Sequence, residues 1–160
     1  MYKTDAIITK VENFKENHLS ISVYSPEYGQ KSLIVFGGKS KKKNSTYVKG
    51  SLNNIEFDNN NVCLSSTSIN TFKWFLFSKY ELKAIDCFCF LINKLLFLAD
   101  QNSNVISYYL LLISKLNERS NYLPELLLLE LEILKASGYQ PDLNESVLKK
   151  IFNFHDKSNL

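Results

Sequence analysis

The chain has 160 residues, enough for one domain or two very small ones but little room for an elaborate active site. Apolar residues make up 45% of it, which excludes a disordered tail and predicts a packed core. The formal net charge of +3 is unevenly distributed, because residues 1–50 carry nine lysines against four acidic residues while residues 67–160 are neutral. This distribution favours a polyanionic partner for the N-terminal part.

The first 66 residues have the pattern of a small β-domain. Residues 18–24 alternate cleanly, with Leu19, Ile21 and Val23 on one face and the intervening residues on the other. The Pro26 and Gly29 region predicts a turn. Together the pattern predicts five short strands, at residues 6–11, 18–24, 31–36, 48–57 and 62–66. Five short strands separated by turn residues are typical of a small closed barrel.

Helical spacing replaces this pattern after an aromatic-rich stretch at residues 69–80. Apolar residues recur at three- and four-residue intervals over residues 82–98, 105–116 and 123–135, and a last short helix is expected at about 144–154. We expect residues 123–134, apolar on nearly every face, to form a helix in the middle of a bundle. The predicted fold class is therefore α+β, with a β-domain at residues 1–66 and an all-α domain at residues 67–160 packed directly on it.

The strongest candidate for a binding site is a lysine-rich loop between two predicted strands. It places four lysines within five positions, and nearby tyrosine and phenylalanine rings are candidates for stacking on bases. Lysine binds phosphate as a point charge and lacks the planar fork that reads a base edge, so binding here should tolerate any sequence and respond to salt. A lysine run is also commonly just a solvated loop, and the pattern alone leaves that reading open. The candidate residues are Lys31, Lys39, Lys41, Lys42, Lys43, Tyr47 and Lys49, with Phe36 and Tyr24 as further rings.

Motifs for catalysis, metals and cofactors are not evident in the sequence. Cys63, Cys87 and Cys89 form no CxxC pair, and the last two are expected to be buried free thiols. His18 and His155 lack neighbours at metal-ligand spacing and are expected to be surface residues. Phosphate-binding glycine loops and nucleophile elbows are also missing. We therefore expect no enzymatic activity, no metal and no cofactor, and, without a signal peptide or membrane span, a cytoplasmic protein.

The segments at residues 4–11, 25–43 and 127–143, taken in order, together resemble the RecO family of bacterial recombinational-repair mediators. Residues 4–11 resemble the opening strand of that family, and residues 25–43 resemble its strand, glycine and basic cluster. Residues 127–143 resemble its late helix, which ends in a glycine-tyrosine-x-proline turn. The chain departs from the family by being short and by having Ser146 where many members place a first zinc-ligand cysteine. It therefore resembles a short member without zinc.

This resemblance implies an N-terminal five-stranded OB-fold followed by a helical domain that docks partners. RecO-like proteins bind and anneal single-stranded DNA and help RecA load onto DNA coated by single-strand-binding protein. The implied partners are single-stranded DNA, a RecR-like protein and the C-terminal tail of single-strand-binding protein, with no membrane. The resemblance implies that Lys39, Lys41, Lys42 and Lys43 contact the DNA backbone, with Lys31 and Lys49 as flanking contacts. It also implies a bacterial cytoplasmic protein that associates with the nucleoid.

Two alternatives remain open from the sequence. The chain could be a protein-interaction adaptor whose DNA binding has been weakened by shortening. It could also be an unrelated basic domain, such as an RNA-binding module or a small enzyme. Neutralising the lysine loop distinguishes the mediator from the adaptor, because DNA binding by the mediator depends on that loop and partner binding by the adaptor does not.

Overall fold

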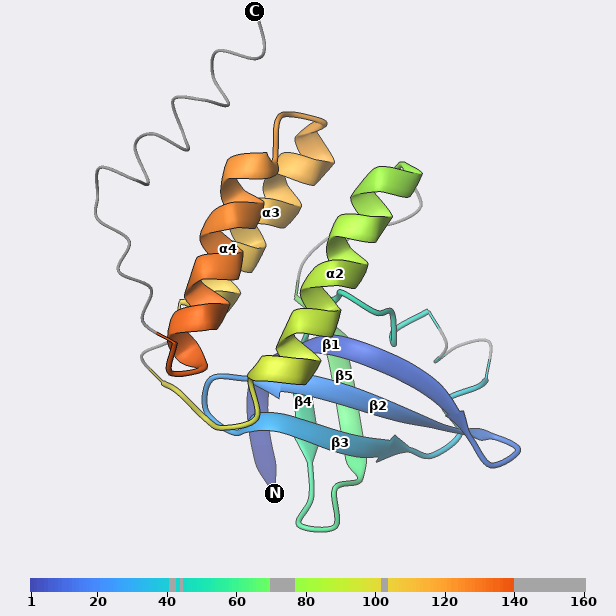
Figure 1. The fold of residues 1–160 in the computed structure, drawn as a ribbon. Coiled ribbons are helices and arrows are strands. Elements are labelled where there is room, and N and C mark those ends of the chain that lie inside the picture. Colours follow the sequence, from blue (N-terminus) through green and yellow to red (C-terminus); the bar gives the residue numbers. More distant parts are fainter. Residues whose placement is uncertain (41–42, 44, 70–76, 102–103, 140–160) are drawn as a thin grey trace, which may run out of the picture.

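The N-terminal part of the chain is a five-stranded barrel (Figure 1). The computed structural model describes residues 1–40, 43, 45–69, 77–101 and 104–139. The strands are β1 (Tyr2–Phe14), β2 (His18–Ser25), β3 (Gly29–Val35), β4 (Leu52–Phe57) and β5 (Cys63–Ser68). All five predicted strands are present, although β4 begins four residues later than expected, because residues 48–51 form a turn in which the Ser51 N–H donates to the Val48 carbonyl (3.0 Å).

The strand order is β3-β2-β1-β4-β5, with every neighbouring pair antiparallel. The long strand β1 pairs with β4 through its first half and with β2 through its second half, with an irregularity between Ile8 and Lys10. The sheet closes where Ile34 of β3 meets Val62 in a parallel bridge, and the Ile34 N–H donates to the Asn61 carbonyl at 2.9 Å. This closed, five-stranded arrangement is that of an OB-fold and confirms the predicted α+β class.

The two faces of the sheet pack into two different hydrophobic cores, one inside the barrel and one against the helices. The predicted alternation holds, since Leu19, Ile21 and Val23 point into the barrel with Ala6, Ile8, Leu33 and Ile55. The opposite face carries Ile7, Tyr24 and Leu52, which are buried against the helices. The barrel therefore contributes side chains both to its own interior and to the helical core, so the two parts pack directly on each other.

The helices of the described residues lie on one side of the barrel (Figure 1), namely α2 (Lys79–Leu95), α3 (Val105–Glu118) and α4 (Leu123–Ala136), with α4 packed against α2 and α3. Helix α2 starts three residues earlier than predicted because Ser78 and Glu81 form a reciprocal capping box. Helix α4 has Pro124 in its first turn. Within the described residues, none of these helices has the length and apolar character needed to cross a membrane.

Two sequence expectations for the helical part need correction. Residues 123–134 do form a helix, but only Leu129, Glu132 and Ile133 of α4 are buried, so it lies against the bundle on one side and is not its centre. Cys87 is exposed on α2, whereas Cys89, two residues on, faces the helical core. The helix expected at 144–154 lies outside the described residues, and the domain division at residue 66 stays a prediction.

Polar contacts fix the helices on the barrel. The Asn93 Oδ1 accepts hydrogen bonds from the Thr9 hydroxyl (2.7 Å) and the Gln30 amide (2.9 Å), so one α2 side chain joins β1 to β3. The Tyr109 hydroxyl of α3 donates to the Gly50 carbonyl next to β4. Because Thr9 and Tyr109 are buried, their hydroxyl groups depend on these partners, and the contacts help to position the helices.

Candidate nucleic-acid interface

Two lysines of the predicted loop lie at one end of the barrel, next to the β1–β2 turn. The Lys39 ammonium donates to the carbonyls of Lys15 (2.9 Å) and Glu16 (3.0 Å), and the Lys43 ammonium donates to the Phe36 carbonyl (3.3 Å). Lys15 itself is exposed, with its ammonium 5.4 Å from the Phe14 ring centroid. We call Lys15, Lys39 and Lys43 the lysine cluster. Lys41 and Lys42 lie outside the described residues.

The lysine cluster keeps its positive charge available for an anion. Among the described residues, no carboxylate lies within ion-pair distance of its three ammonium groups. Their hydrogen bonds go to neutral backbone carbonyls, which orient Lys39 and Lys43 without cancelling their charge. This arrangement suits phosphate binding. Lys15 was not among the residues predicted from the sequence, because only the folding of the barrel brings it next to Lys39.

The two flanking lysines have different surroundings. Lys49 forms an ion pair with Asp86 of α2, with 2.6 Å between ammonium and carboxylate, so its charge is partly neutralised. Lys31 is half-buried near the opposite end of β3, about 16 Å from Phe36 at the ordinary rise of a strand. It lines a cavity there and does not join the lysine cluster.

The predicted stacking role of two tyrosines is wrong. Tyr47 is 8% exposed and packs in the barrel core, with its hydroxyl 3.8 Å from the Cys63 sulfur. Burial raises the pKa of that hydroxyl well above its usual value. Tyr24 is fully buried against the helices. Their rings therefore cannot receive a base.

Phe36 is the predicted ring that stays accessible. Its side chain is 53% exposed beside the lysine cluster. It stands edge-on to the His18 ring, with 4.9 Å between centroids, and the His18 Nδ1 accepts from the Gly37 N–H at 3.1 Å. His18 is thus half-buried and holds the end of β3, not the free surface residue the sequence suggested.

A second group of rings, which sequence reasoning missed, lies at the other end of the barrel. Tyr2 stacks on Phe57 at 5.3 Å between centroids, and Tyr28 meets both rings edge-on at 5.5 Å. We call these three residues the aromatic cluster. The signal that could have revealed Tyr2 is its spacing of two residues from Thr4, which places it on the same face of β1 as the buried Thr4, Ala6 and Ile8.

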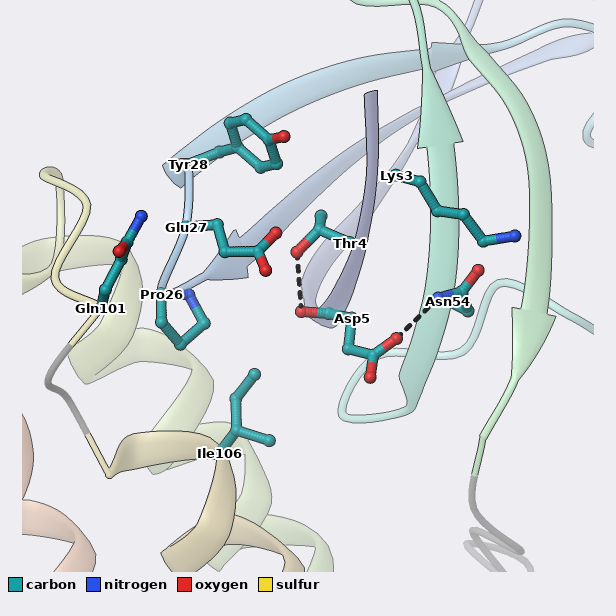
Figure 2. A pocket seen from close by; sticks show the side chains of 9 residues that line it. All are labelled: Lys3, Thr4, Asp5, Pro26, Glu27, Tyr28, Asn54, Gln101 and Ile106. Atoms are coloured by element: carbon teal, nitrogen blue, oxygen red, sulfur yellow. Dashed lines mark hydrogen bonds between the residues drawn. The ribbon is translucent and has the colours of Figure 1, made fainter. Parts of the chain in front are cut away.

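A larger cavity between the barrel and the helices is lined by acidic groups (Figure 2). Its volume is about 810 Å³, and Asp5 of β1 and Glu27 of the β2–β3 turn both line it. The Asp5 carboxylate accepts from the Asn54 amide at 2.6 Å, while the lining Lys3 is paired with Glu56 at 2.9 Å. Among the described residues neither Asp5 nor Glu27 forms an ion pair with a lysine, and two such carboxylates disfavour the approach of phosphate to this cavity.

The barrel with its basic loop matches a known family. Residues 1–65 match the family model of the recombination protein O N-terminal domain. This part of the chain is similar to the N-terminal domain of the RecO family. No curated protein matched the chain.

The RecO domain covers the five strands nearly to the end of β5, and it confirms both the OB-fold and the family resemblance inferred from the sequence. The match supports a RecO-like role in DNA recombination and repair. The lysine cluster and the aromatic cluster both lie within the matched residues, whereas α2, α3 and α4 lie beyond them.

Proposed function

We propose that this chain is a RecO-like mediator that binds and anneals single-stranded DNA and helps RecA load onto DNA coated by single-strand-binding protein. The observation that carries the proposal is a RecO N-terminal OB-fold whose lysine cluster has no carboxylate partner among the described residues. In this proposal the protein acts in the bacterial cytoplasm by binding and positioning DNA, and it catalyses no covalent reaction.

The mechanism follows from the chemistry of ammonium groups. Lysines that approach phosphates release condensed counterions, so affinity falls as salt rises and does not depend on base sequence. Annealing requires two strands to approach each other, and neutralising their phosphates lowers the repulsion between them. The lysine cluster lies on a turn and a loop, where its long side chains can adjust to the flexible backbone of single-stranded DNA.

The helical part would serve protein partners in this proposal. Several large apolar side chains remain exposed on α2 and α3, namely Phe90, Leu110 and Leu111. Such residues are costly to expose and are common where proteins dock. A RecR-like protein and the tail of single-strand-binding protein are the proposed partners. If DNA binding is weak, the same surface supports the adaptor role as the alternative function.

The experiment is a salt titration of binding to a fluorescent single-stranded oligonucleotide. The variant Lys39/Lys43→Gln removes two cations from the lysine cluster, and Lys79/Lys83→Gln removes two exposed lysines of α2 as the matched control. Each phosphate contact contributes about 0.7 to the slope of log affinity against log salt for single strands, so the first variant should lose about 1.4. The control should keep the wild-type slope.

Two outcomes would contradict the proposal. Equal slopes for the two variants would remove the lysine cluster from the DNA interface. A folded wild-type protein that fails to bind at about 20 mM salt, well below the physiological range, would rule out the mediator role. Partner binding that survives in that case would favour the adaptor.

A further inference from the structure

The barrel has a cavity at its mouth, beside the aromatic cluster. The cavity measures about 430 Å³ and is formed by the start of β1, the start of β3 and the β4–β5 turn. In Figure 1 the N-terminus and the β4–β5 turn both lie at the lower edge of the barrel, away from the helices. Barrel mouths and cavities of this size commonly bind small molecules or single groups of a larger ligand.

The aromatic cluster forms one wall of this cavity. Phe57 is only 3% exposed and belongs to the barrel core, so it supports the Tyr2 ring from beneath. Tyr2 is 40% exposed, and Tyr28 holds it from the side. A ring fixed on two sides and open on another loses little conformational entropy when a planar group stacks on it.

The opposite wall carries amides and balanced charge. The Asp58 carboxylate accepts from the N–H groups of Asn60 (2.9 Å) and Val62 (2.8 Å), which fixes the β4–β5 turn. The exposed Asn59 and Asn61 line the cavity from this turn. Lys31 supplies one positive charge and Asp58 one negative charge, so the cavity has no net attraction for phosphate.

We propose that this cavity binds a nucleobase of the single strand whose phosphates contact the lysine cluster. This inference rests on the proposed DNA binding and assigns a second contact to it. The Tyr2 ring stacks on the base, while the Asn59 and Asn61 amides, which can both donate and accept, bond to its edge. The inference therefore assigns the phosphates and the base to different groups of side chains on the barrel.

The two parts of the ligand can be tested separately with an abasic oligonucleotide. This probe keeps every phosphate and lacks every base, so it reports on the lysine cluster alone. Wild-type protein should bind a thymine oligonucleotide about 5- to 150-fold more tightly than an abasic one of equal length, the range for one stacked base. The substitution Tyr2→Leu should remove most of this preference, whereas Tyr2→Phe should retain it.

Tyr80→Leu serves as the control, since Tyr80 is a highly exposed tyrosine of α2. It should leave both affinities unchanged. A second measurement needs no variant: a single strand containing 5-iododeoxyuridine is cross-linked by light to the wild-type protein, and the labelled peptide is identified. The expected cross-link is to Tyr2 or Tyr28.

The outcomes distinguish this inference from the proposed function. Equal affinity of the wild type for both oligonucleotides, or cross-links confined to other segments, overturns the base site and leaves salt-dependent DNA binding intact. The cavity would then be open to an apolar side chain of a protein partner. Failure of the wild type to bind either oligonucleotide overturns both proposals. If Tyr2→Leu does not fold, the cross-linked position decides.

Discussion

The Lys49 ammonium at the end of the basic loop lies 2.6 Å from the Asp86 carboxylate of α2. Both side chains are well exposed, so the pair contributes at most about 1 kcal/mol to stability. Its position is more informative than its strength. A carboxylate of the helical part pairs with a lysine of the barrel, so the helices influence the charge that the barrel presents, and in the proposed function Asp86 competes with DNA phosphate for Lys49.

Replacing Asp86 should therefore strengthen DNA binding. In Asp86→Asn, Lys49 is free to contact phosphate, and we expect affinity for single-stranded DNA to rise about twofold to fivefold at low salt, the range for a surface ion pair. The measurement is fluorescence anisotropy with a labelled oligonucleotide. Glu118→Gln is the matched control, because it removes the same charge from the Lys115 pair on α3. Equal gains in both variants would show an effect of net charge alone.

The Asn93 side chain should be critical to the joint between helices and barrel. Asn93→Ala removes the acceptor of the Gln30 amide and leaves the Thr9 hydroxyl only the Ser22 carbonyl (3.1 Å), so we expect a loss of about 1–2 kcal/mol in the free energy of unfolding. Urea denaturation followed by circular dichroism measures this loss. The exposed Asn13 of β1 provides the control, since Asn13→Ala removes an amide from the surface. Similar costs for the two variants would argue against the joint.

Gly29 is required where β3 begins against the loop that follows α2. Its φ of +65° disfavours any other residue, and a Cβ would lie 2.7 Å from backbone atoms of Phe97 and Leu98. Gly37 has nearly the same φ, +64°, with open space around it. Gly37→Ala should therefore cost only the conformational strain, about 1–2 kcal/mol, and Gly29→Ala clearly more. Urea denaturation of both variants checks this order, and equal costs would show that the clash is relieved.

The three cysteines should differ in reactivity. Burial raises the pKa of Cys89 to about 12 and also raises that of Cys63, so both stay protonated and covered at pH 8. Cys87 is exposed. With a thiol reagent such as Ellman's, we expect one fast-reacting thiol per native chain and three after denaturation, because the thiolate is the nucleophile. The variant Cys87→Ser should lose the fast phase, and its persistence would place the reactive thiol elsewhere.

The sequence alone determined the order and the faces of the β-domain. The alternation from Leu19 to Val23 correctly assigned these side chains to the barrel interior, since the period of two is a local property of a strand. The turn residues and the lysine-rich loop were also correctly located, and the resemblance of residues 4–11 and 25–43 agrees with the RecO domain found over residues 1–65.

Only the tertiary structure decided which aromatic side chains are available. Tyr24 and Tyr47 are near the lysine-rich loop in sequence, yet one is covered by the helices and the other by the barrel. Tyr2, Tyr28 and Phe57 are far apart in sequence and meet because β1 pairs with β4 and the sheet closes through β3 and β5. Local patterns give the face on which a side chain lies, whereas burial depends on what packs against that face, and that is set by contacts between distant segments.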